Sequence, residues 1–231
     1  MKRGFILAAV LSASPLAWEA EAQEAAAQAS ATNALALLQQ GNARFVSDRL
    51  QTKDFTRERP ALVKEQHPYA IVLTCADSRL APEILFDQSL GKLFVVRVAG
   101  NVADPVVLGS IEYAAEHLHT RLLLVLGHDS CGAVQAALAG GHASKNLELL
   151  VHEIVPAAEE AKHRGLDAPH TLDAAVRENV QLQSRHAVAD SPLLAELVEK
   201  KQLQVVGAVY HLDSWKVEIL PDPKQQKLDN H

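Results

Sequence analysis

Two short apolar runs, each followed by a cysteine-containing motif, constrain the fold of this chain more than any other feature. Tyr69–Thr74 leads into Cys75–Arg79 (CADSR), and Arg121–Leu126 leads into Gly127–Gly132 (GHDSCG). Runs of this length are too short for helices and are typical of buried strands. The sequence therefore predicts two strands, each of which carries a cysteine beyond its C-terminal end.

The rest of the chain alternates between strand and helix patterns. We expect a strand at 92–98 that is covered on both faces, a short helix and loop at 80–91, a helix at 106–119 after an Asp104-Pro105 cap, a helix at 132–138, helical stretches at 146–164 and 171–201, and strands at 204–209 and 216–220. Strand-helix-strand order indicates parallel pairing through right-handed crossovers. The predicted fold class is α/β: a mostly parallel central sheet of four strands plus an antiparallel edge strand after the Asp213-Ser214 turn, flanked by helices.

The side chains at the two strand ends suit a metal ion. Cys75, His128 and Cys131 supply two thiolates and one imidazole, a donor set that zinc accepts with a fourth position left open. In an open α/β sheet, ligands gather at the C-terminal ends of strands. We therefore expect one zinc ion per chain at this place.

The N-terminal segment reads as a secretory signal peptide, with two basic residues before an apolar run at 5–11 and a small-residue end at Ala22. An ordinary helix or a retained anchor is the alternative, but the run is too short to span a bilayer. We expect a signal peptide at 1–22, a helical arm at 23–66 whose helix ends or kinks at Gly41-Asn42, an α/β domain at 67–220 and a polar tail at 221–231. The mature protein would be periplasmic or secreted, without a membrane segment.

Export raises a rival interpretation of the cysteines, because an even number of them in an oxidising compartment is typical of a disulfide. The chain has two cysteines, so Cys75–Cys131 is the only possible bridge. A structural bridge, however, has no use for His128 or for Asp77 and Arg79, so the motifs favour zinc. The net charge of -6 without a basic cluster gives no sign of a nucleic-acid partner.

Both motifs together closely resemble the beta-class carbonic anhydrases, whose zinc motifs are Cys-x-Asp-x-Arg and, some fifty residues later, His-x-x-Cys. The stretch Phe94–Asn101 is similar to that family as well. The resemblance implies that 67–220 is a zinc-containing catalytic domain that hydrates carbon dioxide to bicarbonate by zinc-bound hydroxide. A carbonyl sulfide or carbon disulfide hydrolase on the same scaffold, and a noncatalytic secreted domain with the disulfide, are the alternatives.

Asp77 and Arg79 are the expected catalytic pair. A free carboxylate two residues from Cys75 could take the open zinc position and expel the water. The guanidinium of Arg79 can hold that carboxylate away by a bidentate pair, which leaves it free to accept a hydrogen bond from zinc-bound hydroxide. The resemblance implies the same dyad.

The resemblance further implies a substrate pocket and an assembly. Gln66, Phe94, Tyr113 and Gly132 would line the pocket, and in the family two subunits share this cleft. A homodimer or a higher even oligomer is therefore expected. One subgroup of the family is inhibited by bicarbonate in a second pocket that needs a tryptophan three residues before the first zinc cysteine. Here that position is Val72, although Arg97 matches the arginine, so we expect no cooperative bicarbonate inhibition.

Overall fold

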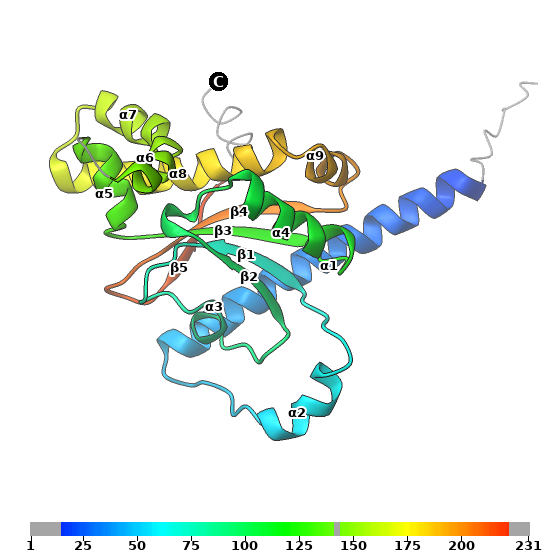
Figure 1. Cartoon of the computed structure of the whole chain (residues 1–231). Helices are drawn as coiled ribbons and strands as arrows, with labels where there is room; N and C mark the ends of the chain where they lie inside the picture. The colour runs from blue at the N-terminus through cyan, green and yellow to red at the C-terminus, as the bar shows by residue number, and fades with distance from the viewer. Residues whose placement is uncertain (1–14, 141–143, 222–231) are drawn as a thin grey trace, which may run out of the picture.

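A five-stranded sheet organises the computed structural model, which describes residues 15–140 and 144–221, with side chains from residue 30 onward. Its strands lie in the order β2-β1-β3-β4-β5 (Figure 1). They are β1 (Ala70–Thr74), β2 (Leu93–Arg97), β3 (Leu122–His128), β4 (Gln204–Tyr210) and β5 (Val217–Ile219). The first four are parallel, and β5 pairs antiparallel to β4. The predicted fold class is thereby confirmed, including the antiparallel edge.

The sheet brings the two cysteine motifs to one edge. Thr74, the last residue of β1, pairs with Leu126 of β3, which continues to His128. All residues of β1 and β3 are buried, as expected for central parallel strands. Cys75 therefore emerges beside the end of β3.

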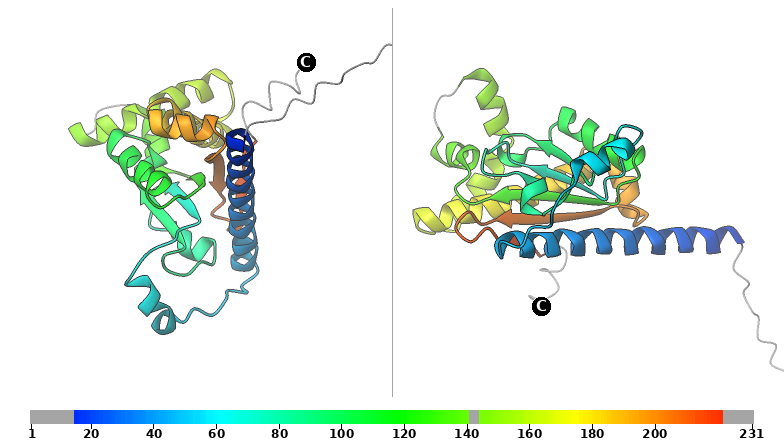
Figure 2. Two further views of the ribbon diagram at one scale, coloured as in Figure 1. Left: turned by 90° about the vertical axis from the view of Figure 1, so that its right-hand side faces the viewer. Right: turned by 90° about the horizontal axis from the view of Figure 1, so that it is seen from below.

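Helices cover both faces of the sheet. Their bounds are α1 (Pro15–Val46), α2 (Phe55–Leu62), α3 (Pro82–Leu85), α4 (Pro105–Glu116), α5 (Gly132–Ala139), α6 (Lys145–His152), α7 (Val155–His163), α8 (Ala168–Ala189) and α9 (Pro192–Glu199), with a 3₁₀ turn η1 (Ala99–Asn101). Figure 2 shows α1 along one face, while α4, α8 and α9 lie on the other. Asp104 caps α4 by accepting a hydrogen bond from the Val107 N–H, as the sequence predicted.

The two long helical stretches that we expected at 146–164 and 171–201 are each divided into two helices. Pro156 lies in the first turn of α7, where a missing N–H costs nothing. Before α9, Ser191 accepts a hydrogen bond from the Leu194 N–H and Pro192 begins the helix. The prediction from apolar periodicity joined each pair of helices into one, whereas a proline in the first turn shows where the second helix begins.

Strand β2 differs from its expected environment. It lies at the edge of the sheet, where β1 is its only partner among the described strands. Leu93 is buried, Phe94, Val95 and Val96 are half-buried, and Arg97 is exposed. The apolar composition had indicated cover on both faces, and a single chain does not provide that cover.

Helix α1 continues through Gly41-Asn42 to Val46, so the expected end or kink is wrong. A Cβ atom on Gly41 would lie 1.8 Å from the Phe86 carbonyl oxygen, so the glycine allows a close approach of two backbones. The buried Asn42 amide donates to the carbonyls of Leu85 and Trp215 and accepts from the Val217 N–H. These two residues join α1 to α3 and β5.

The expected signal peptide lies mostly outside the described residues, because the description begins at Pro15 inside that segment. The backbone of 15–22 belongs to α1. The expected polar tail lies outside the description except for Pro221. Among the residues described, no helix combines the length and the apolar character that crossing a membrane requires.

Candidate metal centre

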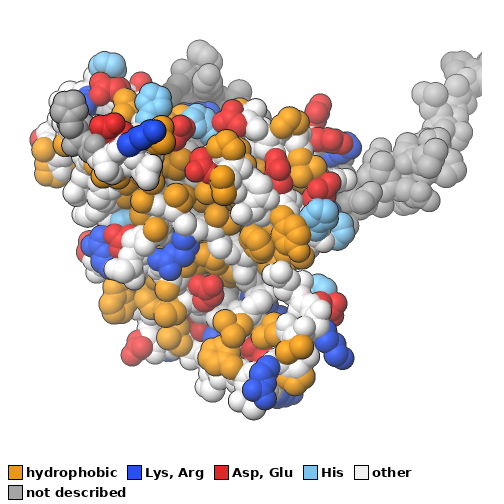
Figure 3. All heavy atoms as spheres, viewed as in Figure 1, with side chains coloured by type: hydrophobic (Ala, Val, Ile, Leu, Met, Phe, Trp, Pro, Cys, Tyr) orange, Lys and Arg blue, Asp and Glu red, His pale blue; other side chains and the backbone are white. Residues whose placement is uncertain are grey.

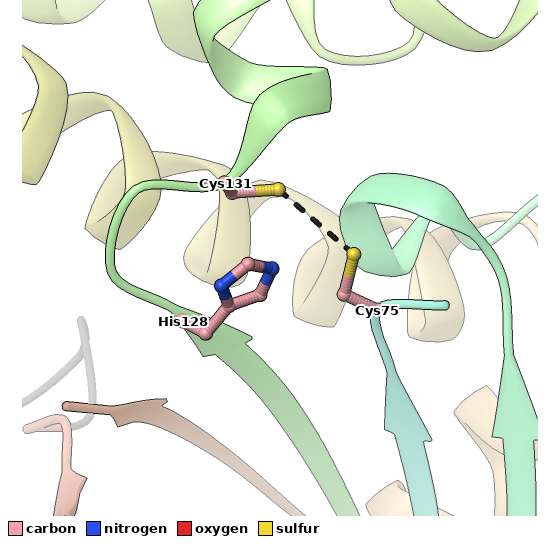
Figure 4. A group of neighbouring side chains, drawn as sticks. All are labelled: Cys75, His128 and Cys131. Atoms are coloured by element: carbon pink, nitrogen blue, oxygen red, sulfur yellow. Dashed lines mark hydrogen bonds between the residues drawn. The ribbon is translucent and has the colours of Figure 1, made fainter. Parts of the chain in front are cut away.

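Three buried side chains meet where β1 and β3 end. Cys75 follows β1, His128 ends β3 and Cys131 precedes the first turn of α5. Their potential ligand atoms all lie within 4.8 Å of one another. Figure 4 shows the imidazole and both sulfur atoms directed into one shared space. The three residues that the sequence singled out as zinc ligands are thus brought together.

The donor set fits zinc. The two sulfur atoms are 3.9 Å apart, and sulfurs bound to a tetrahedral zinc at about 2.3 Å would be about 3.8 Å apart. His128 Nδ1 lies 2.8 Å from the Asp129 carbonyl oxygen, which can only accept, so Nδ1 carries the proton. Nε2 is then a free lone pair, buried and without a hydrogen-bond partner in the part of the chain that the structure describes. A buried acceptor of this kind is costly unless a metal ion or another partner satisfies it.

The two thiols form a strongly coupled pair. The pKa of Cys75 is lowered, first by a hydrogen bond from Cys131 and further by backbone N–H groups. The pKa of Cys131 is raised, because Cys75 already carries the negative charge and because the site is buried. A cation between the sulfurs would remove this conflict and allow both to be thiolates.

The expected pair of Asp77 and Arg79 is formed as the sequence predicted. Arg79 Nε donates to Asp77 Oδ1 at 2.9 Å and Nη2 donates to Oδ2 at 2.7 Å. The same carboxylate accepts from the Arg79 backbone N–H at 2.9 Å. These bonds hold the pKa of Asp77 well below its usual range. Its Oδ2 lies 3.8 Å from His128 Nε2, so the carboxylate borders the candidate metal position.

Arg97 adds a contact that the sequence did not reveal. Its Nη2 donates to the Asp77 carbonyl oxygen at 2.8 Å and lies 3.4 Å from that of Ala76. Two arginines therefore hold the loop after Cys75, one by the side chain of Asp77 and one by its backbone. Val72 is fully buried and has no polar side-chain atom to offer an anion.

The expected substrate-binding residues divide into two groups. Gln66 and Tyr113 line an open pocket of about 760 Å³, and the ring centroids of Phe94 and Tyr113 are 6.2 Å apart. Gln66 lies before β1, and Phe94 pairs with Ile71, three residues before Thr74. At about 3.3 Å per residue, Phe94 is set back about 10 Å from the strand end that leads to Cys75. Gly132, in contrast, directly follows Cys131.

A charged network supports the loop between His128 and Cys131, and sequence reasoning missed it. The Asp129 carboxylate accepts from the Leu212 N–H at 3.2 Å and lies 3.1 Å from His211 Nδ1. His211 Nε2 lies 3.0 Å from Glu218, which Arg177 of α8 binds through two nitrogens. Leu212 and His211 are more than 80 residues from Asp129, so no local pattern could have found this network.

Comparisons with known proteins agree with this geometry. A sequence model of the family described as "Carbonic anhydrase" matches residues 70–217. The carbonic anhydrase of Mycolicibacterium smegmatis is 42% identical over 189 residues, which cover 79% of this chain and 89% of that protein. Carbonic anhydrase 2 of Mycobacterium tuberculosis is 40% identical over 185 residues, which cover 76% and 86%. The structure of the Coccomyxa beta-carbonic anhydrase in complex with acetazolamide, 29% identical, aligns with a TM-score of 0.62 over 73% of this chain and 87% of that one.

Proposed function

The chain belongs to the beta class of the carbonic anhydrase family and is a zinc-dependent enzyme that reversibly hydrates carbon dioxide to bicarbonate; from this premise we propose that Cys75, His128 and Cys131 hold its zinc ion. The single observation that carries the ligand assignment is the buried, unpartnered His128 Nε2 beside two free thiols. Zinc bound there supplies a water ligand whose pKa is lowered toward neutrality.

Asp77 and Arg79 act as the catalytic pair in this proposal. Arg79 engages both oxygens of the carboxylate, which keeps Asp77 off the metal position. Because the pKa of Asp77 is low, the carboxylate is an acceptor at every working pH. It can orient an attacking water or hydroxide by accepting its hydrogen bond, which lowers the entropic part of the barrier.

Neither alternative function is favoured. Both cysteines are free, and their sulfur atoms are 3.9 Å apart, about twice the length of a disulfide bond. The family match and the relatives are named carbonic anhydrases, which does not favour a carbonyl sulfide or carbon disulfide hydrolase.

A homodimer, or a higher even oligomer, completes the proposed site. Hydrophobic side chains gather on the face of α4, α3 and α2 (Figure 3). On this side of the chain Val106 is 83% exposed, Leu90 54% and Tyr113 47%, beside the half-buried edge strand β2. Apolar exposure next to an unpaired strand edge is typical of a subunit interface. We place Gln66, Phe94 and Tyr113 of one subunit over the zinc site of the other, and Gly132 beside its own Cys131.

Export to the periplasm or the medium remains part of the proposal. Its support is the basic start, the apolar run at 5–11 and the small residues before position 23. N-terminal sequencing of protein recovered from a periplasmic fraction tests it. A start at Gln23 is expected, and an intact Met1 in cytosolic protein would contradict export.

Metal analysis combined with thiol titration tests the zinc assignment. The purified protein should hold about one zinc per chain, with both thiols protected until a chelator is added. His128→Ala should lose most of the zinc and the hydration activity together. His163→Ala is the control, because His163 is an exposed side chain at the end of α7. Full zinc occupancy in His128→Ala would disprove the ligand set.

A further inference from the structure

A backbone N–H group contacts the sulfur of Cys75. The Gly100 nitrogen lies 3.4 Å from Cys75 Sγ and donates to it from the turn η1. Gly100 has φ +69, and a Cβ atom there would lie 2.5 Å from Ile154 Cδ1. The backbone conformation and the contact with Ile154 both favour glycine at this position, and glycine is also the residue whose backbone is least restricted by itself. Something outside the turn must hold it in place.

Asn179 of α8 provides that restraint. Its Nδ2 donates to the Gly100 carbonyl oxygen at 2.8 Å, and the side chain is 1% exposed. The Asn101 N–H closes the turn by donating to the Val98 carbonyl oxygen. The glycine is thus fixed on its C-terminal side while its N–H faces the sulfur. Asn179 reaches it across 79 residues of sequence.

Gln183, one helical turn further along α8, fixes Asn179 in turn. Its Nε2 lies 3.1 Å from Asn179 Oδ1 and 3.0 Å from the Glu153 carbonyl oxygen, and its Oε1 accepts from the Ala103 N–H. Gln183 is fully buried. Because its amide is bonded at both ends, it sets the orientation of the Asn179 amide.

The rest of this helix face is apolar. Val176, Val180 and Ala187 of α8 are buried, and Val180 packs against the space beside Gly127 and Gly207. Two buried amides on such a face carry a desolvation cost that leucine would avoid. The Asn179 amide is directed at the turn that contacts Cys75, and the Gln183 amide binds Asn179 and the backbone of Ala103 and Glu153. This arrangement indicates a role in holding that turn rather than in general packing.

We propose that Asn179, held by Gln183, is a positioning residue that keeps the Gly100 N–H on the Cys75 sulfur and so sets how much charge Cys75 donates to zinc. The inference rests on the proposed assignment of Cys75 as a ligand. An N–H dipole directed at a thiolate stabilises its negative charge and weakens its donation to the metal. A weaker donor leaves zinc a stronger Lewis acid toward its water.

Cobalt-substituted protein gives a readout that general destabilisation does not move. Thiolate bound to Co²⁺ produces a near-ultraviolet charge-transfer band whose energy falls when the sulfur loses a hydrogen bond. Asn179→Leu replaces the amide with an apolar side chain of similar volume. We expect the band to move to longer wavelength, because a sulfur that loses its N–H donor gives more charge to the metal. Gln183→Met should produce a smaller shift in the same direction.

Leu194→Ala is the control, since Leu194 is fully buried in α9 and removing its side chain destabilises the fold without touching Gly100. It should lower the melting temperature and leave the band unmoved. If both α8 variants keep the wild-type band, the inference is overturned while the zinc site stands. If the unmodified cobalt protein shows no thiolate band, the ligand assignment itself fails.

A measurement on the unmodified chain decides the matter even if the α8 variants do not fold. In ¹¹³Cd-substituted protein, a hydrogen bond to a metal-bound sulfur transmits a scalar coupling from the metal to the amide proton. The Gly100 amide should show this coupling and should exchange slowly with solvent. A Gly100 amide that lacks the coupling, in a spectrum where other sulfur contacts show it, would overturn the inference.

Discussion

The carboxylate of Asp77 illustrates how one residue decides whether this site is open. It lies two residues from Cys75 and 3.8 Å from His128 Nε2, close enough to compete for the metal. The guanidinium of Arg79 engages both oxygens, and Arg97 binds the carbonyl of the same residue. Because Arg79 is exposed, its ion pair with Asp77 contributes little to stability. Its role is to fix the orientation of the Asp77 carboxylate.

Arg79→Ala should therefore separate activity from metal content. Without the guanidinium, the carboxylate can rotate onto zinc and occupy the position needed by water. We expect kcat/KM for hydration to fall by roughly a hundredfold while zinc stays near one per chain. Stopped-flow hydration assays and metal analysis check this, with Arg185→Ala of α8, an exposed arginine, as the control. A fully active Arg79→Ala enzyme at neutral pH would contradict the proposed role.

His211 should make stability depend on pH through the network around Asp129. Burial lowers the pKa of His211, but the hydrogen bonds and charges of Glu218 and Asp129 outweigh it, so the pKa is raised. A raised pKa contributes stability below the unfolded value of about 6.5, and this stability is lost as pH rises through the folded pKa.

Urea unfolding of the zinc-loaded protein at several pH values tests this. The wild-type free energy of unfolding should decline above about pH 6.5 by more than that of His211→Gln. The difference should stay below about 1 kcal/mol, because the imidazole is partly solvated. His163→Gln should follow the wild-type curve. Identical slopes in wild type and His211→Gln would show that His211 is not the titrating group.

At the scale of the elements, Gly41 joins α1 to the rest of the fold. Gly41→Ala would place a methyl group against the Phe86 carbonyl oxygen, which belongs to the backbone and cannot rotate away. Overpacking of this kind costs about 1–3 kcal/mol, or several degrees in melting temperature for a chain of this size. Gln40→Ala is the control in the same helix, since Gln40 is an exposed residue next to Gly41. It should be neutral or slightly stabilising. Equal melting temperatures for the two variants would refute the close approach.

The contrast between these elements explains what the sequence could predict. Strands β1 and β3 were predictable because short apolar runs have few other interpretations, and parallel pairing then places Cys75 beside His128. The cap of α4 was predictable because Asp104 and Pro105 act locally. Gly41 was misread as a helix end, because a glycine inside a helix and one that ends it look alike in sequence.

Longer-range contacts were beyond the reach of sequence patterns. Asn179 and Gln183 look like ordinary polar residues of an amphipathic helix, and only the packing of α8 on η1 turns them inward. The edge position of β2 was missed for a related reason. Apolar composition reports that a strand will be covered, but it does not say whether the same chain or another subunit provides the cover.

At the scale of the whole molecule, the expected substrate-binding residues do not converge within one chain. Gln66 and Tyr113 line a pocket to which none of Cys75, His128 and Cys131 contributes among the residues described. A twofold symmetric interface would resolve this, because each subunit would present its pocket residues to the zinc site of its partner. Two equivalent composite sites would then form in every dimer.

Mixing two inactive variants tests this arrangement. Cys75→Ala should lack zinc, and Gln66→Ala should keep zinc but lack the amide. In a mixed dimer, the zinc site of the Gln66→Ala subunit faces an intact Gln66 from its partner. The other site lacks both the zinc ion and the Gln66 amide. The two variants are unfolded, mixed in equal amounts and refolded with zinc, so that about half of the dimers contain one subunit of each variant. Each mixed dimer has one complete site out of two, so about a quarter of wild-type activity should return. Each variant refolded alone is the control. If the pocket served its own chain, no mixture could combine the two intact halves, and activity would stay at the level of the separate variants.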